Sequence, residues 1–262
     1  MTLRIHRLPI VRSIFSVLFT VAMCVLPVLA QAGEVQVAVA ANFTAPMKTI
    51  AAEFTKETGH TVAMTFGATG KVYAQIKNGA PFDIFLSADD ETPKRLEKEG
   101  HAVAGTRFTY ATGRLALWSP RVNFVDPQGE VLKSGAFAHI ALASPKLAPY
   151  GAAAVETLRK LGLMATLEPK FVLGESIGQT FSFVATGNAP LGFVALSQVF
   201  ESGQLKNGSA WVVPAHLHTA LRQDAVLLTK GKASAGAIAF MSYLKTDKTR
   251  AVTRTYGYEV GP

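Results

Sequence analysis

Four short segments of the chain place small or hydroxyl-bearing residues where a predicted strand ends and a predicted helix begins. They are residues 40–43 (AANF), 67–70 (GATG), 149–151 (PYG) and 175–178 (ESIG). The first N–H groups of a helix have no partner inside it, and the helix dipole places partial positive charge there. Small residues let a ligand approach these groups closely. The four segments together predict a site for a small oxyanion that is bound by neutral donors.

Each segment contains one candidate donor, and the four are Asn42, Thr69, Tyr150 and Ile177. Asn42 and Thr69 can donate from the side chain, whereas Ile177 can contribute only its backbone N–H. Each also has an ordinary structural explanation. Asn is a favoured helix cap, Thr in a Gly-x-x-Gly segment is commonly a turn residue, and a tyrosine usually packs with its hydroxyl in water. The set, rather than any single residue, therefore predicts the site.

Strands alternate with helices along the chain after residue 32. The periodicity predicts strands at residues 35–39, 61–66, 82–86, 114–118, 139–143, 171–173, 191–195 and 225–228. It predicts helices at residues 43–58, 72–77, 93–98, 151–161 and 233–244, and one more after Ile177. This alternation is typical of parallel sheet units.

The layout predicts an α/β protein with two lobes, each a central, mostly parallel sheet flanked by helices. We expect the first lobe to comprise residues 33–112 and 222–262, and the second lobe residues 113–221. The chain would cross between lobes near residues 111–112 and return near Leu221. Two of the four segments fall in each lobe. A cleft between the lobes, floored by four helix starts, would suit a small dehydrated oxyanion.

Residues 1–32 have the three parts of a secretion signal. Three arginines, and no acidic residue, precede an apolar run over residues 13–30 that ends in a small-x-small pattern at residues 30–32. The run is at the short end of the roughly 20 residues that span a bilayer, and Pro27 interrupts it. A lipoprotein attached at Cys24 fits poorly because Met23 precedes that cysteine. We therefore expect cleavage after Ala30 or Ala32 and a periplasmic mature protein.

The composition of the mature chain argues against two classes of partner. The formal charge of the full sequence is +8, and loss of the three signal arginines lowers it to about +5. The lysines are dispersed, without a dense basic run interleaved with aromatic residues, which argues against nucleic-acid binding. No apolar stretch after residue 32 reaches membrane-spanning length, so we expect the mature protein to be soluble. The single cysteine, Cys24, leaves with the signal.

Several longer runs resemble one family of exported proteins. Residues 40–47 (AANFTAPM), 78–89 (NGAPFDIFLSAD), 148–151 (APYG) and 189–195 (APLGFVA) are similar, in the same order, to runs in the periplasmic molybdate-binding proteins of molybdate ABC transporters, the ModA family. The resemblance covers essentially the whole mature chain. It implies a monomeric, two-lobe periplasmic binding protein of type II, with the ligand in the interlobe cleft. Such a protein holds molybdate or tungstate without a cofactor and delivers it to a membrane permease.

The resemblance also implies roles for the four candidate donors. In this family the anion is held by neutral groups, which match the side chains of Asn42 and Thr69 and the backbone N–H groups of Tyr150 and Ile177. One branch of the family adds a tyrosine hydroxyl at the position of Ala195, which this chain cannot supply. We expect Tyr150 or Asn42 to replace that donor.

Two other functions stay open on the residues alone. One is a binding protein for a different oxyanion, such as sulfate, thiosulfate or phosphate, because a fold does not determine its ligand. The other is an exported hydrolase or another enzyme on an α/β scaffold.

Three further groups of residues invite a chemical interpretation. Asp83 and Asp89 could be a catalytic carboxylate pair, but no nucleophile and histidine accompany them, so we expect structural roles. His216 and His218 could bind a metal, but no cysteine or acidic cluster lies nearby in the sequence, so we expect surface residues. Lys71 follows the second segment, and we expect a solvated surface lysine there because lysines are rarely buried.

Overall fold

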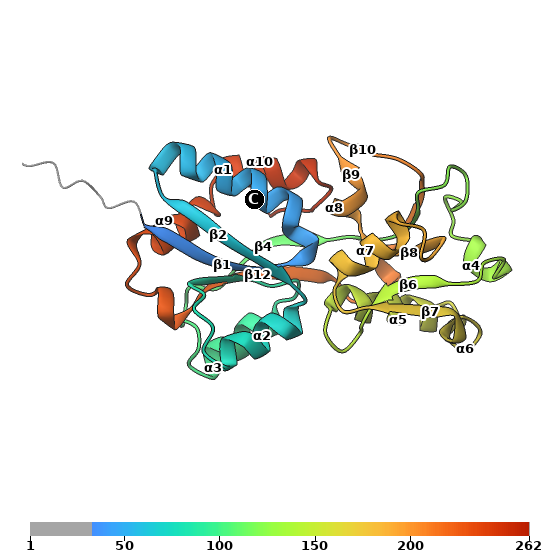
Figure 1. Ribbon diagram of the computed structural model, residues 1–262, viewed down its shortest axis with the longest axis horizontal. Helices are drawn as coiled ribbons and strands as arrows, with labels where there is room; N and C mark the ends of the chain where they lie inside the picture. Colours follow the sequence, from blue (N-terminus) through green and yellow to red (C-terminus); the bar gives the residue numbers. More distant parts are fainter. Residues whose placement is uncertain (1–32, 262) are drawn as a thin grey trace, which may run out of the picture. The chain divides into compact units, whose positions relative to one another are not determined.

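Two five-stranded sheets organise residues 33–261, the part of the chain that the computed structural model describes (Figure 1). The first sheet has the order β2-β1-β3-β12-β4, and the second β11-β5-β8-β6-β7. The first contains β1 (Glu34–Ala40), β2 (Thr61–Gly67), β3 (Ile84–Leu86), β4 (Phe108–Gly113) and β12 (Leu221–Leu227). The second contains β5 (Leu115–Ser119), β6 (Ile140–Ala143), β7 (Phe171–Gly174), β8 (Leu191–Ala195) and β11 (Ser209–Val212). The predicted signal peptide lies outside the described residues.

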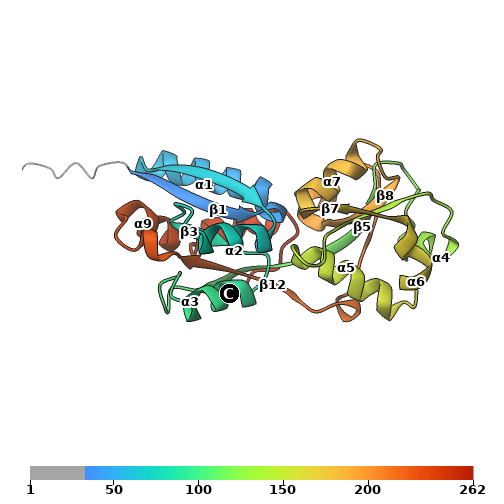
Figure 2. The ribbon, with the colours of Figure 1, turned by 60° about the horizontal axis from the view of Figure 1, so that its bottom comes forward.

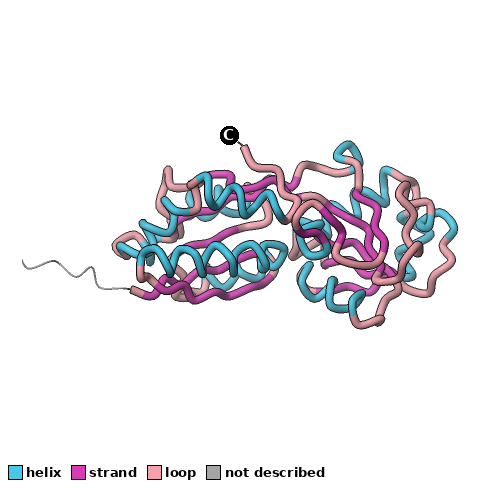
Figure 3. The backbone as a smooth tube through the Cα atoms, turned by 90° about the horizontal axis from the view of Figure 1, so that it is seen from above, coloured by secondary structure: helices cyan, strands magenta, loops and turns pink. Residues whose placement is uncertain are grey.

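Helices cover both faces of each sheet (Figure 3). The longer helices are α1 (Thr44–Thr58), α2 (Thr69–Lys77), α3 (Glu91–Lys98), α5 (Pro149–Lys160), α7 (Ile177–Ala185), α9 (Ala235–Tyr243) and α10 (Asp247–Thr255). Short elements complete the second lobe, namely α4 (Val131–Ser134), α6 (Met164–Leu167), α8 (Leu196–Val199) and a hairpin of β9 (Phe200–Glu201) and β10 (Gln204–Leu205). No helix among residues 33–261 is long and apolar enough to cross a bilayer.

The first sheet is buried on both sides because side chains of a strand point alternately to opposite faces. Val35, Val37 and Val39 of β1 pack on one face in a cluster with residues of α1 and α9. Ala38, between them, packs on the other face in a cluster with residues of α2 and α3. The near-continuous apolar run of β1 is the expected pattern for such a strand.

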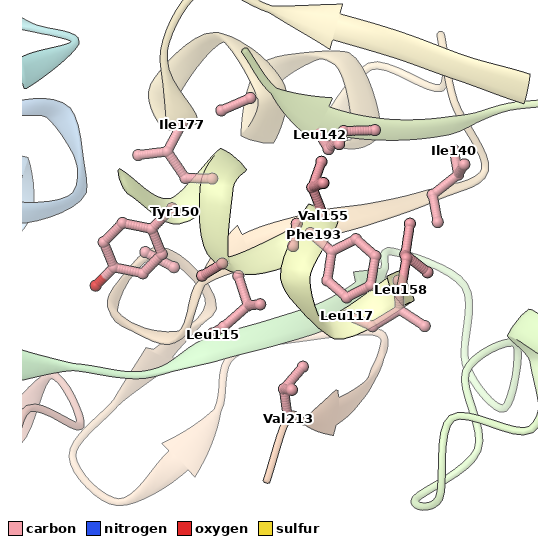
Figure 4. Close-up of a cluster of buried hydrophobic side chains, with 14 of the residues drawn as sticks. Leu115, Leu117, Ile140, Leu142, Tyr150, Val155, Leu158, Ile177, Phe193 and Val213 are labelled. Carbon is pink, nitrogen blue, oxygen red and sulfur yellow. The ribbon is translucent and has the colours of Figure 1, made fainter. Parts of the chain in front are cut away.

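The second sheet follows the same rule. Leu115 and Leu117 of β5 pack in a cluster with residues of α5, and Figure 4 shows both leucines within it. Trp118, pointing to the other face, packs in a cluster with Val184 of α7. The two sheets thus have separate apolar cores, and Figure 2 shows two groups of elements, one around each sheet.

The predicted two-lobe α/β fold of the periplasmic binding proteins is confirmed, and both sheets turn out to be mixed. β1 is parallel to β2 and β3, and β6 is parallel to β7 and β8, as the strand–helix–strand pattern predicts. β12 pairs antiparallel with β3 and β4, and β5 pairs antiparallel with β8 and β11. These antiparallel strands adjoin the crossings, where β4 ends at Gly113 and β5 begins at Leu115.

The packing of α2 against α3 creates one ion-pair cluster with a pH-dependent role. Lys77, Arg95 and the Tyr73 hydroxyl each donate to the Glu99 carboxylate at 2.9 Å. Hydrogen bonds from Lys77 and then Arg95 lower the pKa of Glu99 from 4.5 to about 2. Because the folded-state pKa is depressed, the stabilisation is present above pH about 4.5 and is lost as the pH falls towards 2.

We expect Glu99→Gln to flatten the decline in unfolding free energy between neutral pH and pH 3, since the variant has no carboxylate to protonate. Urea unfolding at pH 7 and pH 3 measures this. Glu91→Gln is the control, since its partner Lys94 is 3.6 Å away and the Glu91 side chain is 76% exposed. Equal pH dependence in wild type and Glu99→Gln would contradict the prediction.

Candidate functional site

The four candidate donors of the sequence analysis line one small cavity. Asn42 and Thr69 come from the first lobe, and Tyr150 and Ile177 from the second. The cavity has about 190 Å³ of atom-free space, which includes space open to solvent. Its other lining residues are small or apolar, namely Ala40, Ala41, Gly67, Ala68, Ala88, Ala148 and Pro149. The structure therefore brings the predicted residues together, and each precedes or begins a helix as expected.

Two of the helices that begin at the cavity, α2 and α5, have no side-chain cap. Ser234 and Thr246 cap α9 and α10 by accepting a hydrogen bond from a first-turn N–H. The corresponding residues before α2 and α5 are Ala68 and Ala148, which have no side-chain acceptor. The Tyr150 N–H in the first turn of α5 is thus not claimed by a capping side chain, whereas in α2 the Gly70 N–H donates to Leu147 O at 2.9 Å. Ser176 does cap α7, through the N–H of Gln179 at 3.2 Å, further along the helix than Ile177.

The Thr69 hydroxyl is oriented as a donor to the cavity. Thr69 is 3% exposed, and its Oγ1 accepts a hydrogen bond from the Ala88 N–H at 3.1 Å. The Ser87 hydroxyl lies 3.5 Å from the same oxygen, at the limit for a hydrogen bond. Because the closer neighbour, the Ala88 N–H, donates to the Thr69 oxygen, the proton of the Thr69 hydroxyl can be donated to a ligand.

The Asn42 amide is buried at the same cavity and is incompletely bonded. Asn42 is 2% exposed, and its Nδ2 donates to Gln223 Oε1 at 2.7 Å and to the Tyr258 hydroxyl at 2.9 Å. Its Oδ1 is buried without a hydrogen-bond partner among the residues that the structure describes. An unpaired buried amide atom costs about 1–3 kcal/mol, so this atom marks a position where a ligand is expected.

Tyr150 and Ile177 hold their backbone groups at the cavity through their side chains. Figure 4 shows both side chains at one edge of the second-lobe core, with the Tyr150 hydroxyl directed out of the cluster. The Tyr150 hydroxyl bonds Gln223 Nε2 at 3.0 Å. Burial raises the pKa of Tyr150 well above its ordinary value of 10. This phenol therefore stays neutral at physiological pH.

The cavity lining carries no charged side chain among the described residues. Asp89, just outside it, accepts from the Thr92 N–H at 2.8 Å and from the Ser87 hydroxyl at 3.1 Å, and burial raises the pKa of Asp89. Asp83 accepts from the Gln36 N–H at 2.8 Å. Both carboxylates thus have the structural roles predicted for them. An anion in the cavity would be bound by dipoles alone.

Contacts between the lobes surround the cavity. The Gly70 N–H donates to Leu147 O at 2.9 Å, and the Ser197 hydroxyl donates to Asn42 O at 2.8 Å. Lys71, predicted to be a solvated lysine, is half exposed, but its Nζ also pairs with Glu175 Oε1 of the other lobe at 2.6 Å. These bonds hold the lobes together around the ligand position.

Sequence reasoning missed the polar groups behind the cavity. Gln223 and Tyr258 are buried and bond Asn42 directly, and the buried Tyr110 bonds Gln223. The polar run of Arg222, Gln223 and Asp224 within β12 was the available signal. Of the two predicted surface histidines, His216 is exposed, whereas His218 is 7% exposed and its Nδ1 lies 2.8 Å from Thr219 O.

Known proteins resemble this chain over nearly all of its described length. The family model for bacterial extracellular solute-binding proteins matches residues 35–259. The molybdate-binding protein ModA of Azotobacter vinelandii is 61% identical over 229 residues, which are 87% of this chain and 91% of that one. The ModA protein of Rhodobacter capsulatus is 54% identical, over 87% of this chain and 89% of that one.

A solved structure agrees with these relatives. The structure of the Azotobacter vinelandii periplasmic molybdate-binding protein superimposes with a TM-score of 0.84 at 41% identity, and covers 87% of this chain and 100% of that one. The chain therefore belongs to the bacterial extracellular solute-binding proteins, in the ModA family of molybdate-binding proteins.

Proposed function

We propose that this protein captures molybdate in the cavity between its lobes and delivers it to the membrane permease of an ABC importer. The observation that carries the proposal is the convergence of Asn42, Thr69, Tyr150 and Ile177, two from each lobe, on one uncharged cavity. The names of the related ModA proteins support molybdate as the ligand. Tungstate, which has the same charge and tetrahedral geometry, is proposed as a second ligand.

Neutral donors suit this task for a physical reason. A desolvated dianion must receive several hydrogen bonds, and bonds to a charged acceptor are stronger than neutral ones. Donors fixed on two lobes select by size, because a smaller anion such as sulfate cannot reach all of them at once. We propose Asn42 and Thr69 as side-chain donors and Tyr150 and Ile177 as backbone donors.

The remaining features of the proposal follow from the same role. The protein acts in the periplasm after removal of residues 1–32, as a monomer that binds no cofactor and catalyses no reaction. Its first lobe comprises residues 33–112 and 222–262 and its second lobe residues 113–221. Closure of the lobes about their crossings then forms the surface that the permease recognises. No observation on this chain favours sulfate, thiosulfate or phosphate as the ligand.

Thermal unfolding with added anions tests the proposal. Ligand at about a thousand times its Kd stabilises the native state by about 4 kcal/mol, which is a rise of about 8–16 °C in Tm for a domain of this size. We expect molybdate and tungstate to give such a shift and equal concentrations of sulfate or phosphate to give little. A shift with sulfate or phosphate but not with molybdate would refute the ion assignment.

The ion pair between Lys71 and Glu175 is expected to slow ligand release modestly. Both side chains are about half exposed, at 54% and 47%, so solvent screens the pair and we expect it to contribute about 0.2–1 kcal/mol to closure. We expect Lys71→Met or Glu175→Gln to raise the molybdate release rate up to about fivefold at low salt, and less at high salt. Stopped-flow release measures this.

Lys94→Met is the control for the ion-pair variants, since Lys94 pairs with Glu91 within one lobe. A release rate in Lys71→Met that equals the wild-type rate at low salt would contradict the interlobe role.

A further inference from the structure

A buried amide, Gln223, joins the two halves of the cavity. Gln223 is fully buried in β12 of the first lobe. Its side chain contacts Asn42 at 2.7 Å, the Tyr110 hydroxyl at 2.9 Å and the Tyr150 hydroxyl at 3.0 Å. Asn42 and Tyr150 are proposed ligand-binding residues from different lobes. Gln223 is therefore in direct contact with both sides of the ligand position without lining the cavity itself.

The orientation of the Asn42 amide determines whether it attracts or repels an anion. With Nδ2 directed to Gln223 and Tyr258, the unpartnered atom is Oδ1, which is an acceptor and repels an anion. The oxygen and nitrogen of an amide have nearly the same size, so their assignment follows from the hydrogen-bond network around them. A bound dianion requires the opposite orientation of Asn42.

Turning Asn42 and Gln223 together keeps the hydrogen bonds that join Asn42, Gln223, Tyr110 and Tyr150. Gln223 Nε2 then donates to Asn42 Oδ1 and to the Tyr110 oxygen, and Tyr110 keeps its bond to Ser87 O at 2.9 Å. Gln223 Oε1 then accepts the proton of the Tyr150 hydroxyl across the same 3.0 Å. The atom of Asn42 left without a protein partner becomes Nδ2, a donor.

The hydroxyl of Tyr258 also fits this second arrangement. In place of accepting from Asn42 Nδ2, it donates to Asn42 Oδ1 across the same 2.9 Å. The Ser197 hydroxyl supplies the bond to Asn42 O at 2.8 Å, so the backbone carbonyl remains satisfied. The bonds of Asn42 to Gln223 and to Tyr258 keep their distances and exchange donor and acceptor, while Tyr258 no longer donates to Asn42 O or to Ser197 Oγ.

The backbone at the crossing makes room for this contact between lobes. A Cβ on Gly113, the last residue of β4, would lie 2.0 Å from the Tyr150 hydroxyl and 2.4 Å from Gln223 Nε2. The pairing of β12 with β4 shifts register between Gln223 and Asp224. Such a bulge redirects side chains, and here it lies where Gln223 meets Tyr150.

We propose that Gln223 is the positioning residue that turns the Asn42 amide nitrogen towards the ligand, and that its bond to the Tyr150 hydroxyl couples this orientation to closure of the lobes. This inference rests on the proposed function and deepens it. In the closed state Gln223 Oε1 accepts the Tyr150 proton, which directs Gln223 Nε2 towards Asn42 and leaves Asn42 Nδ2 for the anion. Closure and donor orientation therefore occur together.

A double-mutant cycle separates this role from a merely structural one. Molybdate affinity is measured by titration calorimetry for wild type, Gln223→Met, Asn42→Ala and the double variant. Methionine keeps the length and volume of the side chain without its hydrogen bonds. We expect Gln223→Met to weaken binding roughly tenfold, and to add less than about threefold in the Asn42→Ala background, because the affected donor is then absent. The same loss factor in both backgrounds, or no loss in Gln223→Met, would overturn the proposal.

Controls keep the test interpretable. Thr157→Val removes a buried hydroxyl that bonds Ala153 O at 2.8 Å within α5, and it should lower stability without changing affinity. If Gln223→Met does not fold, Tyr150→Phe replaces it, since it removes the hydroxyl and keeps the ring and the backbone N–H. We expect Tyr150→Phe to weaken molybdate binding less in the Asn42→Ala variant than in wild type. An equal loss of affinity in both would overturn the proposal. Failure of wild type to bind molybdate would refute the proposed function itself, which is a separate result.

Discussion

Replacing Asn42 and Thr69 together by alanine is expected to abolish stabilisation by molybdate while the protein still folds. Each side chain is proposed to donate to the dianion, and hydrogen bonds to charged groups are worth about 1.5–3 kcal/mol each, so affinity should fall by about 10²–10⁴. The fold should survive because both residues lie at helix starts and not within the apolar cores. Thermal unfolding with and without molybdate, together with circular dichroism, measures both quantities.

The paired variant Thr186→Ala and Asn188→Ala is the matched control for this experiment. It removes the same two residue types at an exposed position after α7, where the two side chains bond at 3.3 Å. We expect an unchanged molybdate shift there. A full shift in the cavity variant would mean that the anion binds elsewhere in the protein.

Gly151→Ala, in the first turn of α5, is expected to destabilise the protein more than Gly236→Ala in the first turn of α9. A Cβ at this position, in the first turn of α5, would lie 2.1 Å from Ala143 O and 2.7 Å from its carbon. The obstacle is backbone, so no side-chain rotation relieves it, and α5 must move away from β6. Such overpacking costs about 1–3 kcal/mol or more. The shift also moves the Tyr150 N–H, so molybdate affinity should fall together with stability.

Gly236→Ala provides the comparison at a similar place in another helix. Gly236 is also in the first turn of its helix, α9, but its nearest neighbours are side-chain atoms of Val35 and His60 at 3.0 and 3.2 Å. These ends can shift by a few tenths of an ångström, so we expect a change within about 1 kcal/mol. Urea unfolding measures both variants. A smaller loss of unfolding free energy in Gly151→Ala than in Gly236→Ala would contradict the prediction that the Ala143 backbone blocks a Cβ at residue 151.

The part of the site that could be predicted from sequence is the part encoded locally. Asn42, Thr69, Tyr150 and Ile177 each lie at a strand–helix junction, where the change from one periodicity to another is visible in a few residues. Their convergence followed from the two-lobe pattern, and the structure brings them to one cavity. Their roles in ligand binding remain predictions.

The rest depended on contacts between residues far apart in sequence. Gln223 and Tyr258 meet Asn42 across sequence separations of 181 and 216 residues, and nothing local indicates which way their side chains point. The strand β4, over residues 108–113, was not predicted because its buried and exposed positions do not alternate regularly. Its place is set by pairing with β12, which brings two distant segments together.

The alanines before α2 and α5 make the empty protein less stable than its fold allows. A serine or aspartate at Ala68 or Ala148 would bond the first-turn N–H groups and stabilise each helix by about 1 kcal/mol. At Ala148 the oxygen of that side chain would compete with the anion for the Tyr150 N–H, which is a proposed ligand donor. Selection for thermal stability alone would therefore tend to remove anion binding, and a search for stabilised variants should leave Ala148 unchanged.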